Sequence, residues 1–167
     1  SENVIDATLS DTFSNAKGRI VLATFASNIN RIQQVLDAAQ KFNRKVVISG
    51  RSMQKNIEIA KTLGYLNFKD NLIIELNEAK ATQDKKLVII CTGTQGEPMS
   101  ALTRMANGTH KHFIIGSSDR VIITASVIPG NERLVSSVIN QLLRLGSDVY
   151  YEQARDIHVS GHASQEE

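Results

Sequence analysis

The amino-acid sequence predicts an α/β fold of three layers, in which a mostly parallel sheet is flanked by helices. Two observations predict it. Short, nearly continuous apolar runs alternate with segments whose apolar residues recur at helical spacing. The apolar runs lack the polar alternation of a half-solvated sheet, so each strand is expected to be covered on both faces. Strands that alternate with helices are typical of parallel sheets.

The first half of the chain predicts the alternation clearly up to residue 64, and residues 65–86 are less patterned. Ser27 or Asn28 suits a helix cap, and Gly64 stands where a helix should stop. The elements expected in this half are a helix over 2–15, a strand over 19–24, a helix from 28 to about 42, a strand over 45–49, a helix that Ser52 caps and that runs to 63, a short strand over 72–75, and a polar loop or short helix over 78–86.

The second half continues in the same way. Leu87–Cys91 is expected to be the most central strand. Pro98 suits the first turn of a helix, and Gly108 suits the end of that helix. The other elements expected here are strands over 112–115 and 120–125 and a helix from its cap Asn131 to Leu145, with Leu134, Val135, Val138 and Leu142 as its buried face.

Composition narrows the class of protein. The 167 residues fit one domain with an ordinary core. A net charge of +2 is too weak to indicate a nucleic-acid partner by itself, and the scarcity of aromatic residues (5%, no Trp) argues against a broad base-stacking surface. No apolar run approaches the ~18 residues of a membrane span. The single Cys91 excludes an internal disulfide and fits a cytoplasmic location; it is expected to be a packing residue rather than a nucleophile.

Loops of Gly, Ser, Thr and Asn follow four of the predicted strands, and each loop opens a helix. In a parallel sheet such loops share the carboxyl edge, where ligands bind, and helix N-termini there favour anions. The loops at Ser27, Ser52, Gly93–Gly96 and Gly130–Asn131 are therefore expected to form one anion-binding rim. Capping alone would also explain Ser or Asn in any single loop. None of the four is a recognised nucleotide-binding signature.

A cluster of polar residues lies near the end of the chain. If residues 156–163 are extended, Asp156, His158, Ser160 and His162 fall on one side, and Gly161 allows close approach to a ligand. Histidine and serine donors suit a phosphate, although a strand end with polar residues turned to water would look the same. A zinc site from His158 and His162 is disfavoured, because Val159 and Gly161 oppose a helix. Thr109–His112 is expected to be a solvated link.

Several motifs together resemble one known family. They are Ala23–Asn28, Gly50–Met53, Cys91–Met99, Ala106–His110, Ile128–Asn131 and His158–Ala163, and the resemblance covers essentially the whole chain. The chain is similar to the β-CASP domain of bacterial J-type ribonucleases, which are metallo-β-lactamase nucleases. Residues 1–156 would be this α/β domain, and 157–167 would return toward the metallo-β-lactamase domain. Ser164–Glu167 has the form of a capping box with no helix after it, so we expect the chain to be a piece of a longer protein.

The resemblance implies a parent enzyme that degrades RNA from 5′ to 3′, can also cut internally, and acts in RNA decay and maturation. It implies that Ser27, Asn28 and Ile29 help to hold a terminal phosphate of the RNA. The rest of that pocket would be His158, Val159, Ser160, Gly161 and His162, and His162 would also be the catalytic histidine beside the scissile phosphate. The preferred substrate would be RNA with a 5′-monophosphate. The parent would be a homo-oligomer or a hetero-oligomer with a paralogue, with no membrane partner.

The chain lacks the family's metal-binding motifs, so none of its residues is expected to bind the metal. Two zinc ions would be held elsewhere in the parent, where they would activate water, and this chain alone should not hydrolyse RNA. Two alternatives stay open from the sequence. The chain could be a stand-alone module that binds a nucleotide or a sugar phosphate, or a subunit of an inactive paralogue.

Overall fold

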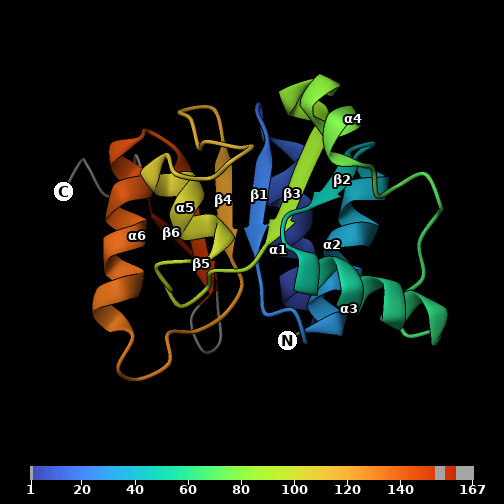
Figure 1. Ribbon diagram of the computed structural model, residues 1–167, viewed down its shortest axis with the longest axis horizontal. Helices are drawn as coiled ribbons and strands as arrows, with labels where there is room; N and C mark the ends of the chain where they lie inside the picture. The colour runs from blue at the N-terminus through green and yellow to red at the C-terminus, as the bar shows by residue number, and fades with distance from the viewer. Residues whose placement is uncertain (1, 153–156, 161–167) are drawn as a thin grey trace.

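The computed structural model describes the backbone of residues 2–152 and 157–160 and the side chains of residues 7–152. Helices and strands alternate along most of the chain, as expected (Figure 1). The elements are α1 (Glu2–Ser14), β1 (Ile20–Ala23), α2 (Ile29–Lys41), β2 (Lys45–Ile48), α3 (Arg51–Thr62), α4 (Leu76–Ala81), η1 (Asp84–Lys86), β3 (Leu87–Cys91), α5 (Ala101–Asn107), β4 (Arg120–Ile123), α6 (Glu132–Arg144), β5 (Asp148–Glu152) and β6 (Ile157–Ser160).

The sheet has the order β2-β3-β1-β4-β5-β6. The first five strands pair in parallel, and β6 runs antiparallel to β5. The predicted α/β fold with a mostly parallel sheet is therefore confirmed. β3 is an inner strand, but β1 lies at the middle of the five parallel strands, with β3 and β4 beside it. The prediction that β3 is the most central strand was wrong because an apolar run reports burial and not lateral position.

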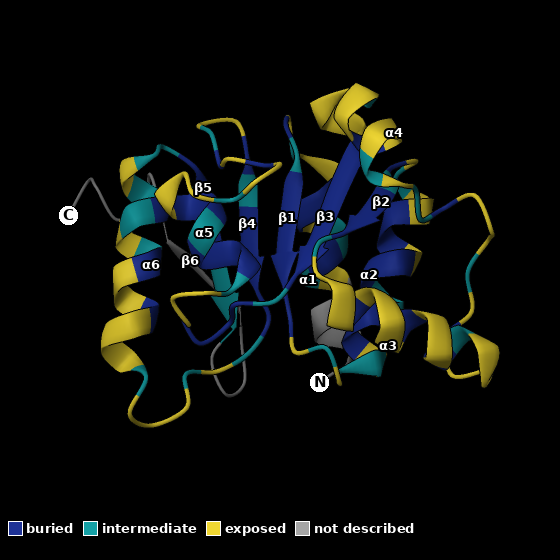
Figure 2. Ribbon diagram, viewed as in Figure 1, coloured by how far each residue is buried: buried dark blue, intermediate teal, exposed yellow. Residues whose placement is uncertain are grey.

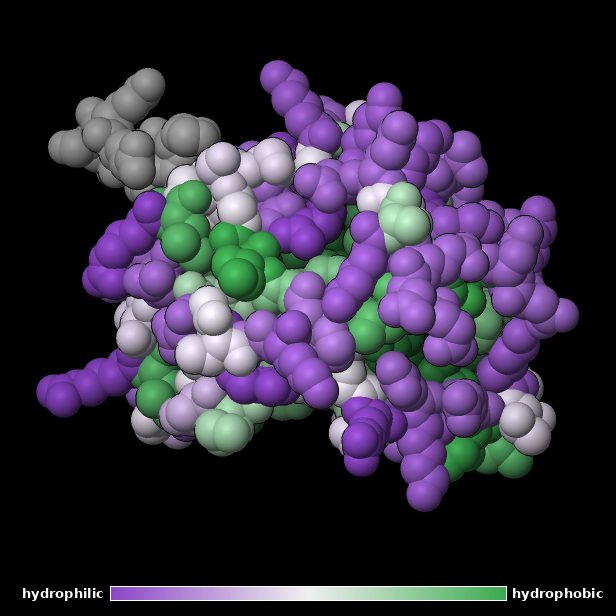
Figure 3. All heavy atoms as spheres, turned by 45° about the horizontal axis from the view of Figure 1, so that its top comes forward, coloured by the Kyte–Doolittle hydropathy of each residue, from purple (hydrophilic) through white to green (hydrophobic). Residues whose placement is uncertain are grey.

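Both faces of the sheet are covered, as the apolar runs predicted. Ile20 and Leu22 of β1 pack into one cluster with residues of α1, α2 and α3. Val21 and Ala23 point the other way and pack with residues of α4, α5 and α6. Figure 2 shows β1, β3 and β4 as the buried centre of the molecule. On the face shown in Figure 3, hydrophobic residues form separate patches between hydrophilic ones.

Two of the predicted strands do not form. Residues 112–115 pack under α5 instead, with Phe113 and Ile115 buried and the Ile115 N–H donating to Met105 O at 3.2 Å. The inner strands β3, β1, β4 and β5 already have partners on both sides. The expected strand over 72–75 is reduced to one parallel bridge between Ile73 and Val46 of β2. Residues 78–86 fall in α4, a short link and η1, which agrees with the expected loop or short helix.

Helix starts were the least accurate predictions. Ser52 lies inside α3, whose cap is Gly50. Pro98 precedes α5, which begins at Ala101, because the Ser100 hydroxyl accepts from Thr103 N and caps it. Asn131 does precede α6, but its side chain bonds to Gln95 and not to the helix. On α6, Val135, Val138 and Leu142 are buried as expected, whereas Leu134 is 40% exposed because it packs at the edge of the helix face.

Candidate anion-binding site at the carboxyl edge of the sheet

The four loops predicted to form a rim follow the carboxyl ends of four adjacent parallel strands. They come after β2, β3, β1 and β4 in the order of the sheet. The loops are not equivalent, however. The loop after β1 is exposed at Ser27, whereas Gly93 to Gly96 in the loop after β3 are buried. The predicted rim therefore divides into a part that is open to a ligand and a part that packs.

The β1–α2 loop carries the open donors. Asn28 caps α2 as predicted, because its Oδ1 accepts from Arg31 N at 3.1 Å. The N–H groups of Ile29 and Ile32 also have partners, in Ser27 O and Asn28 O. In the part of the chain that the structure describes, no partner is assigned to the Ser27 hydroxyl, the Asn28 amide NH₂ or the Asn30 N–H. These groups lie at a helix N-terminus, where an anion is stabilised.

A buried arginine belongs to the same first turn of α2. Arg31 is 7% exposed, and its Nη2 donates to both carboxylate oxygens of Glu152 at 3.0 Å. Its Nε and Nη1 have no hydrogen-bond partner among the residues described. Burial raises the pKa of Glu152 and the Arg31 charge opposes that rise. Sequence reasoning missed this residue, although its position four residues before Val35 places it on the inner stripe of α2.

The loop after β3 is used for packing. Gln95 is buried; its Nε2 donates to Ser126 O at 3.0 Å and its Oε1 accepts from Ile128 N at 2.8 Å. Gly96 has φ +70°, and a Cβ there would lie 2.4 Å from Leu134 O at the start of α6. The glycine is therefore required by close contact with α6. Residues 93–96 are buried and offer no exposed donors to an anion. For this loop we therefore favour a packing role over the predicted anion-binding role.

A histidine outside the predicted site also lies at this edge. His110 Nε2 is 3.0 Å from Ser49 Oγ, and its Nδ1 accepts from the N–H groups of His112 and Phe113 at 3.1 Å. Because Nδ1 accepts twice, the proton lies on Nε2, which donates to Ser49. Burial, followed by the charges of Arg104 and His112, lowers the pKa of His110. The expectation of a solvated link was wrong for this residue.

The C-terminal part of the predicted site is described only as backbone over 157–160. This segment is a strand, as the period-2 reading expected. Ile157 is paired with Glu152 near the carboxyl edge, and Ser160 is paired with Val149 further down the sheet. The β6 backbone thus leads away from the β1–α2 loop, and the structure does not bring Ser160 and Ser27 together in this pairing. The predicted residues Gly161 and His162 lie outside the described residues, as do the side chains of His158, Val159 and Ser160.

The described residues offer no metal site. No group of three or more His, Cys, Asp or Glu side chains among them could hold a metal ion. The donors among the described residues therefore do not fit the zinc centre that the resemblance implies for the parent. Cys91 is buried, and burial raises its pKa to about 12, which fits its predicted packing role. No helix in the described part of the chain is long and apolar enough to cross a membrane.

Comparison with known proteins gives consistent matches. Residues 17–142 match the family described as "Ribonuclease J, beta-CASP domain". Ribonuclease J of Helicobacter pylori (strain ATCC 700392 / 26695) is 46% identical over 167 residues, which is 100% of this chain and 24% of that protein. Ribonuclease J2 of Bacillus subtilis (strain 168) is 43% identical over 100% of this chain and 30% of that protein. Ribonuclease J of Mycolicibacterium smegmatis is 44% identical over 98% of this chain and 29% of that protein. The chain thus spans 24% to 30% of the length of these relatives.

Proposed function

Because the chain belongs to the family of ribonuclease J β-CASP domains, we propose that it is the RNA-holding domain of a metal-dependent ribonuclease that degrades RNA from 5′ to 3′ and also cuts internally. Within that enzyme, the chain binds the 5′-monophosphate of the RNA. Its residues hold the substrate in place while the parent's metal centre supplies the activated water. RNA is therefore the proposed partner. The oligomeric state and the cytoplasmic location stay predictions.

The donor set at the β1–α2 loop is the observation that carries the proposal. The Ser27 hydroxyl, the Asn28 NH₂ and the Asn30 N–H have no assigned partner among described residues, and they stand together at the N-terminus of α2. A terminal phosphate carries negative charge and several acceptor oxygens, which match such donors. Ile29 is the first residue of the helix, between Asn28 and Asn30. A 5′-hydroxyl lacks the charge and the acceptors, so the site favours phosphorylated RNA.

The positive charge of Arg31 supports a negatively charged ligand at this site. Arg31 has two buried nitrogens without a partner among the residues described, and it is attached to the same first turn of α2. Glu152 neutralises part of its charge. A single extra anion of moderate charge therefore suits the site better than a triphosphate, which would bring more charge than the available donors can satisfy. This is the physical basis for the proposed preference for a monophosphate.

The segment 158–162 is proposed to complete the pocket, with His162 as the catalytic histidine. In the β6 pairing Ser160 lies level with Val149, so Ser160 has to leave β5 to reach Ser27. We therefore propose that RNA or the rest of the parent protein competes with β5 for residues 158–160. The β5–β6 pairing involves an edge strand of only four residues, which makes such an exchange inexpensive.

Cleavage by the full-length parent tests the catalytic part of the proposal. The variant His162→Ala is expected to abolish cleavage. His112→Ala, which removes an exposed histidine elsewhere, is the matched control and should cleave normally. Full activity of His162→Ala would remove His162 from the mechanism. A chain that binds free mononucleotides as tightly as phosphorylated RNA would instead support the stand-alone nucleotide module.

A further inference from the structure

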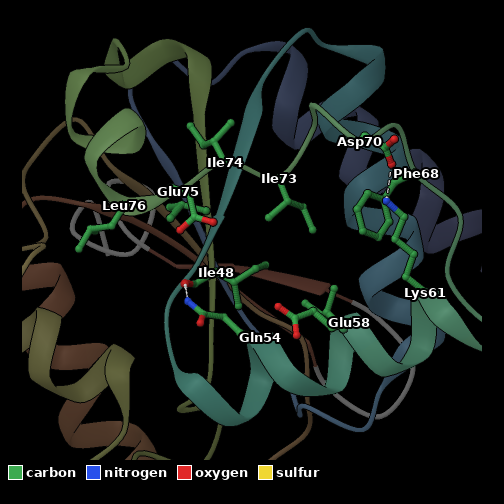
Figure 4. Close-up of a pocket in the computed structure, with 12 residues that line it drawn as sticks. Ile48, Gln54, Glu58, Lys61, Phe68, Asp70, Ile73, Ile74, Glu75 and Leu76 are labelled. Carbon is green, nitrogen blue, oxygen red and sulfur yellow. Dashed lines mark hydrogen bonds and ion pairs between the residues drawn. The ribbon is translucent and has the colours of Figure 1, made fainter.

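A cavity of about 280 Å³ opens on the outer side of β2, away from the β1–α2 loop (Figure 4). One wall is α3, which contributes Gln54, Ile57, Glu58 and Lys61 from a single helix face. The opposite wall is the segment from Phe68 to Leu76. Binding sites for drug-sized molecules occupy about 300–1,000 Å³, so this cavity suits a smaller, fragment-sized ligand.

The cavity exists because the edge of the sheet is only partly covered. On the outer side of β2, the Val46 N–H donates to Leu72 O at 3.0 Å, and the Val46 carbonyl accepts from Ile74 N at 2.8 Å. Alternation along the strand turns the backbone groups of Ile48 outward as well. Among the described residues, no strand pairs with Ile48 on this outer side. Instead, Gln54 Nε2 donates to the Ile48 carbonyl oxygen at 3.0 Å. The chain turns away into α4 at this level, which leaves a hollow in place of a paired strand.

The floor of the cavity is apolar. Val47, Ile48 and Ile57 lie there, each at most 5% exposed, and the partly buried Ile73 and Ile74 close the opposite side. An apolar group placed on this floor would lose contact with water at little conformational cost, because the walls already stand apart. The floor therefore selects a ligand with an apolar body.

The rim of the cavity is acidic. Lys61 is already occupied, since its Nζ lies 2.7 Å from Asp70 Oδ1 and 4.3 Å from the centre of the Phe68 ring. Glu58 and Glu75 have no assigned partner in the described part of the chain, and Figure 4 shows them on opposite walls. The carboxylates of Glu58, Asp70 and Glu75 and the ammonium of Lys61 together give the rim a charge of −2. Such a rim attracts a cation and repels an anion such as RNA.

We propose that this cavity is a binding site for a small organic cation, that is, a short apolar body carrying an ammonium or guanidinium group. The body lies on Ile48 and Ile57, and the cationic group is held between Glu58 and Glu75. The site does not depend on the proposed RNA function. Carboxylates alone would not define it; the buried apolar floor beneath them does.

Titration of the ¹⁵N-labelled chain with three matched fragments tests the proposal. Phenethylamine, 2-phenylethanol and 3-phenylpropanoate share one apolar body and differ in charge. Phenethylamine is expected to bind in the millimolar range, with the largest amide shifts at residues 48, 57 and 73–75, and about tenfold more tightly than the carboxylate. Equal affinity of the amine and the carboxylate, or no shifts at these residues up to 20 mM amine, would overturn the proposal.

Two variants assign the charge to named residues. Glu58→Gln and Glu75→Gln should each weaken phenethylamine binding roughly two- to fivefold, the range of an exposed ion pair. Both residues are exposed, so the fold should tolerate the change. Glu78→Gln, an exposed position on α4 outside the cavity lining, is the control and should bind normally. Unchanged affinity in both cavity variants would show that the carboxylates do not hold the cation.

Discussion

Arg31 on α2 and Glu152 at the end of β5 form an ion pair in which one guanidinium nitrogen lies 3.0 Å from both carboxylate oxygens. The two residues are 121 positions apart and join the first turn of α2 to the last residue of β5. Both side chains are largely buried, with 9% and 18% exposed. The pair therefore fixes the proposed phosphate site to the strand from which the chain leads toward β6.

Glu152→Gln is predicted to have opposite effects on stability and on anion binding. Loss of the carboxylate leaves the buried Arg31 charge without its partner, which should lower the free energy of unfolding by on the order of 2 kcal/mol. The same change removes a negative charge next to the proposed phosphate, so the affinity for 5′-monophosphorylated RNA should rise. Urea unfolding and a binding titration measure the two effects. Weaker phosphate binding in this variant would contradict the placement of the phosphate near Arg31.

Gly96→Ala is predicted to be much more destabilising than Gly108→Ala. Both glycines have a left-handed backbone, with φ +70° and +76°, so both substitutions carry a backbone cost of about 1 kcal/mol. Only at Gly96 would the new Cβ collide with α6, 2.4 Å from Leu134 O, and this should add about 2 kcal/mol. Equal losses of unfolding free energy in the two variants would mean that α6 does not depend on this contact.

Gln95→Leu should loosen the loop after β4. The change removes the bonds from Gln95 to Ser126 O and Ile128 N, and it leaves those backbone groups to find water, at a cost of about 2 kcal/mol. Amide exchange at Ile128 should accelerate, whereas exchange in β1 should change only with global stability. Gln83→Leu, at an exposed position, is the control. Unaltered exchange at Ile128 would show that Gln95 does not hold this loop.

His110 is predicted to make the fold sensitive to mild acid. Its folded-state pKa is lowered, first by burial, so the unfolded chain takes up the proton more readily than the folded one. Its contribution to stability is therefore complete above the ordinary pKa of about 6.5 and is lost as the pH falls through the lowered folded-state value. Protonation would also remove the Nδ1 acceptor that His112 N and Phe113 N share.

Comparison of unfolding free energies at pH 7.5 and pH 5.0 checks this dependence. The decrease at low pH should be smaller in His110→Gln than in the unsubstituted chain. Gln83→Leu, at an exposed position outside this histidine cluster, is the control and should keep the whole decrease. An identical decrease with and without His110 would assign the acid sensitivity to other groups.

Local patterns predicted most of the fold. Apolar runs found β1 to β4, because strands buried on both faces leave no polar alternation, and helical spacing found α2 and α6. Lateral strand order was not predictable, since it depends on which edges other strands occupy. Residues 112–115 have a strand-like composition, yet they pack under α5, and this tertiary contact is not visible in the composition. Pro98 suggested a helix start that the Ser100 cap places later.

The candidate site was predictable only in its local part. The cap at Asn28 follows from residue type and position. Arg31 reaches Glu152, and Gln95 reaches Ile128, only after distant segments are packed together, so neither contact is visible in the sequence. The pairing of β6 with β5 is likewise a tertiary result. For this reason the part of the predicted pocket at residues 158–162 stays a prediction.

The central claim is that the loop between β1 and α2 holds the 5′-phosphate of RNA. The most direct measurement is an amide NMR titration of this chain with one short oligoribonucleotide in two forms, 5′-monophosphorylated and 5′-hydroxyl. We predict shifts at Ser27, Asn28 and Asn30 with the phosphorylated form only, and a further shift at Ser160 as residues 158–162 join the site. The same shifts with the 5′-hydroxyl form, or no shift over residues 27–31, would contradict the claim.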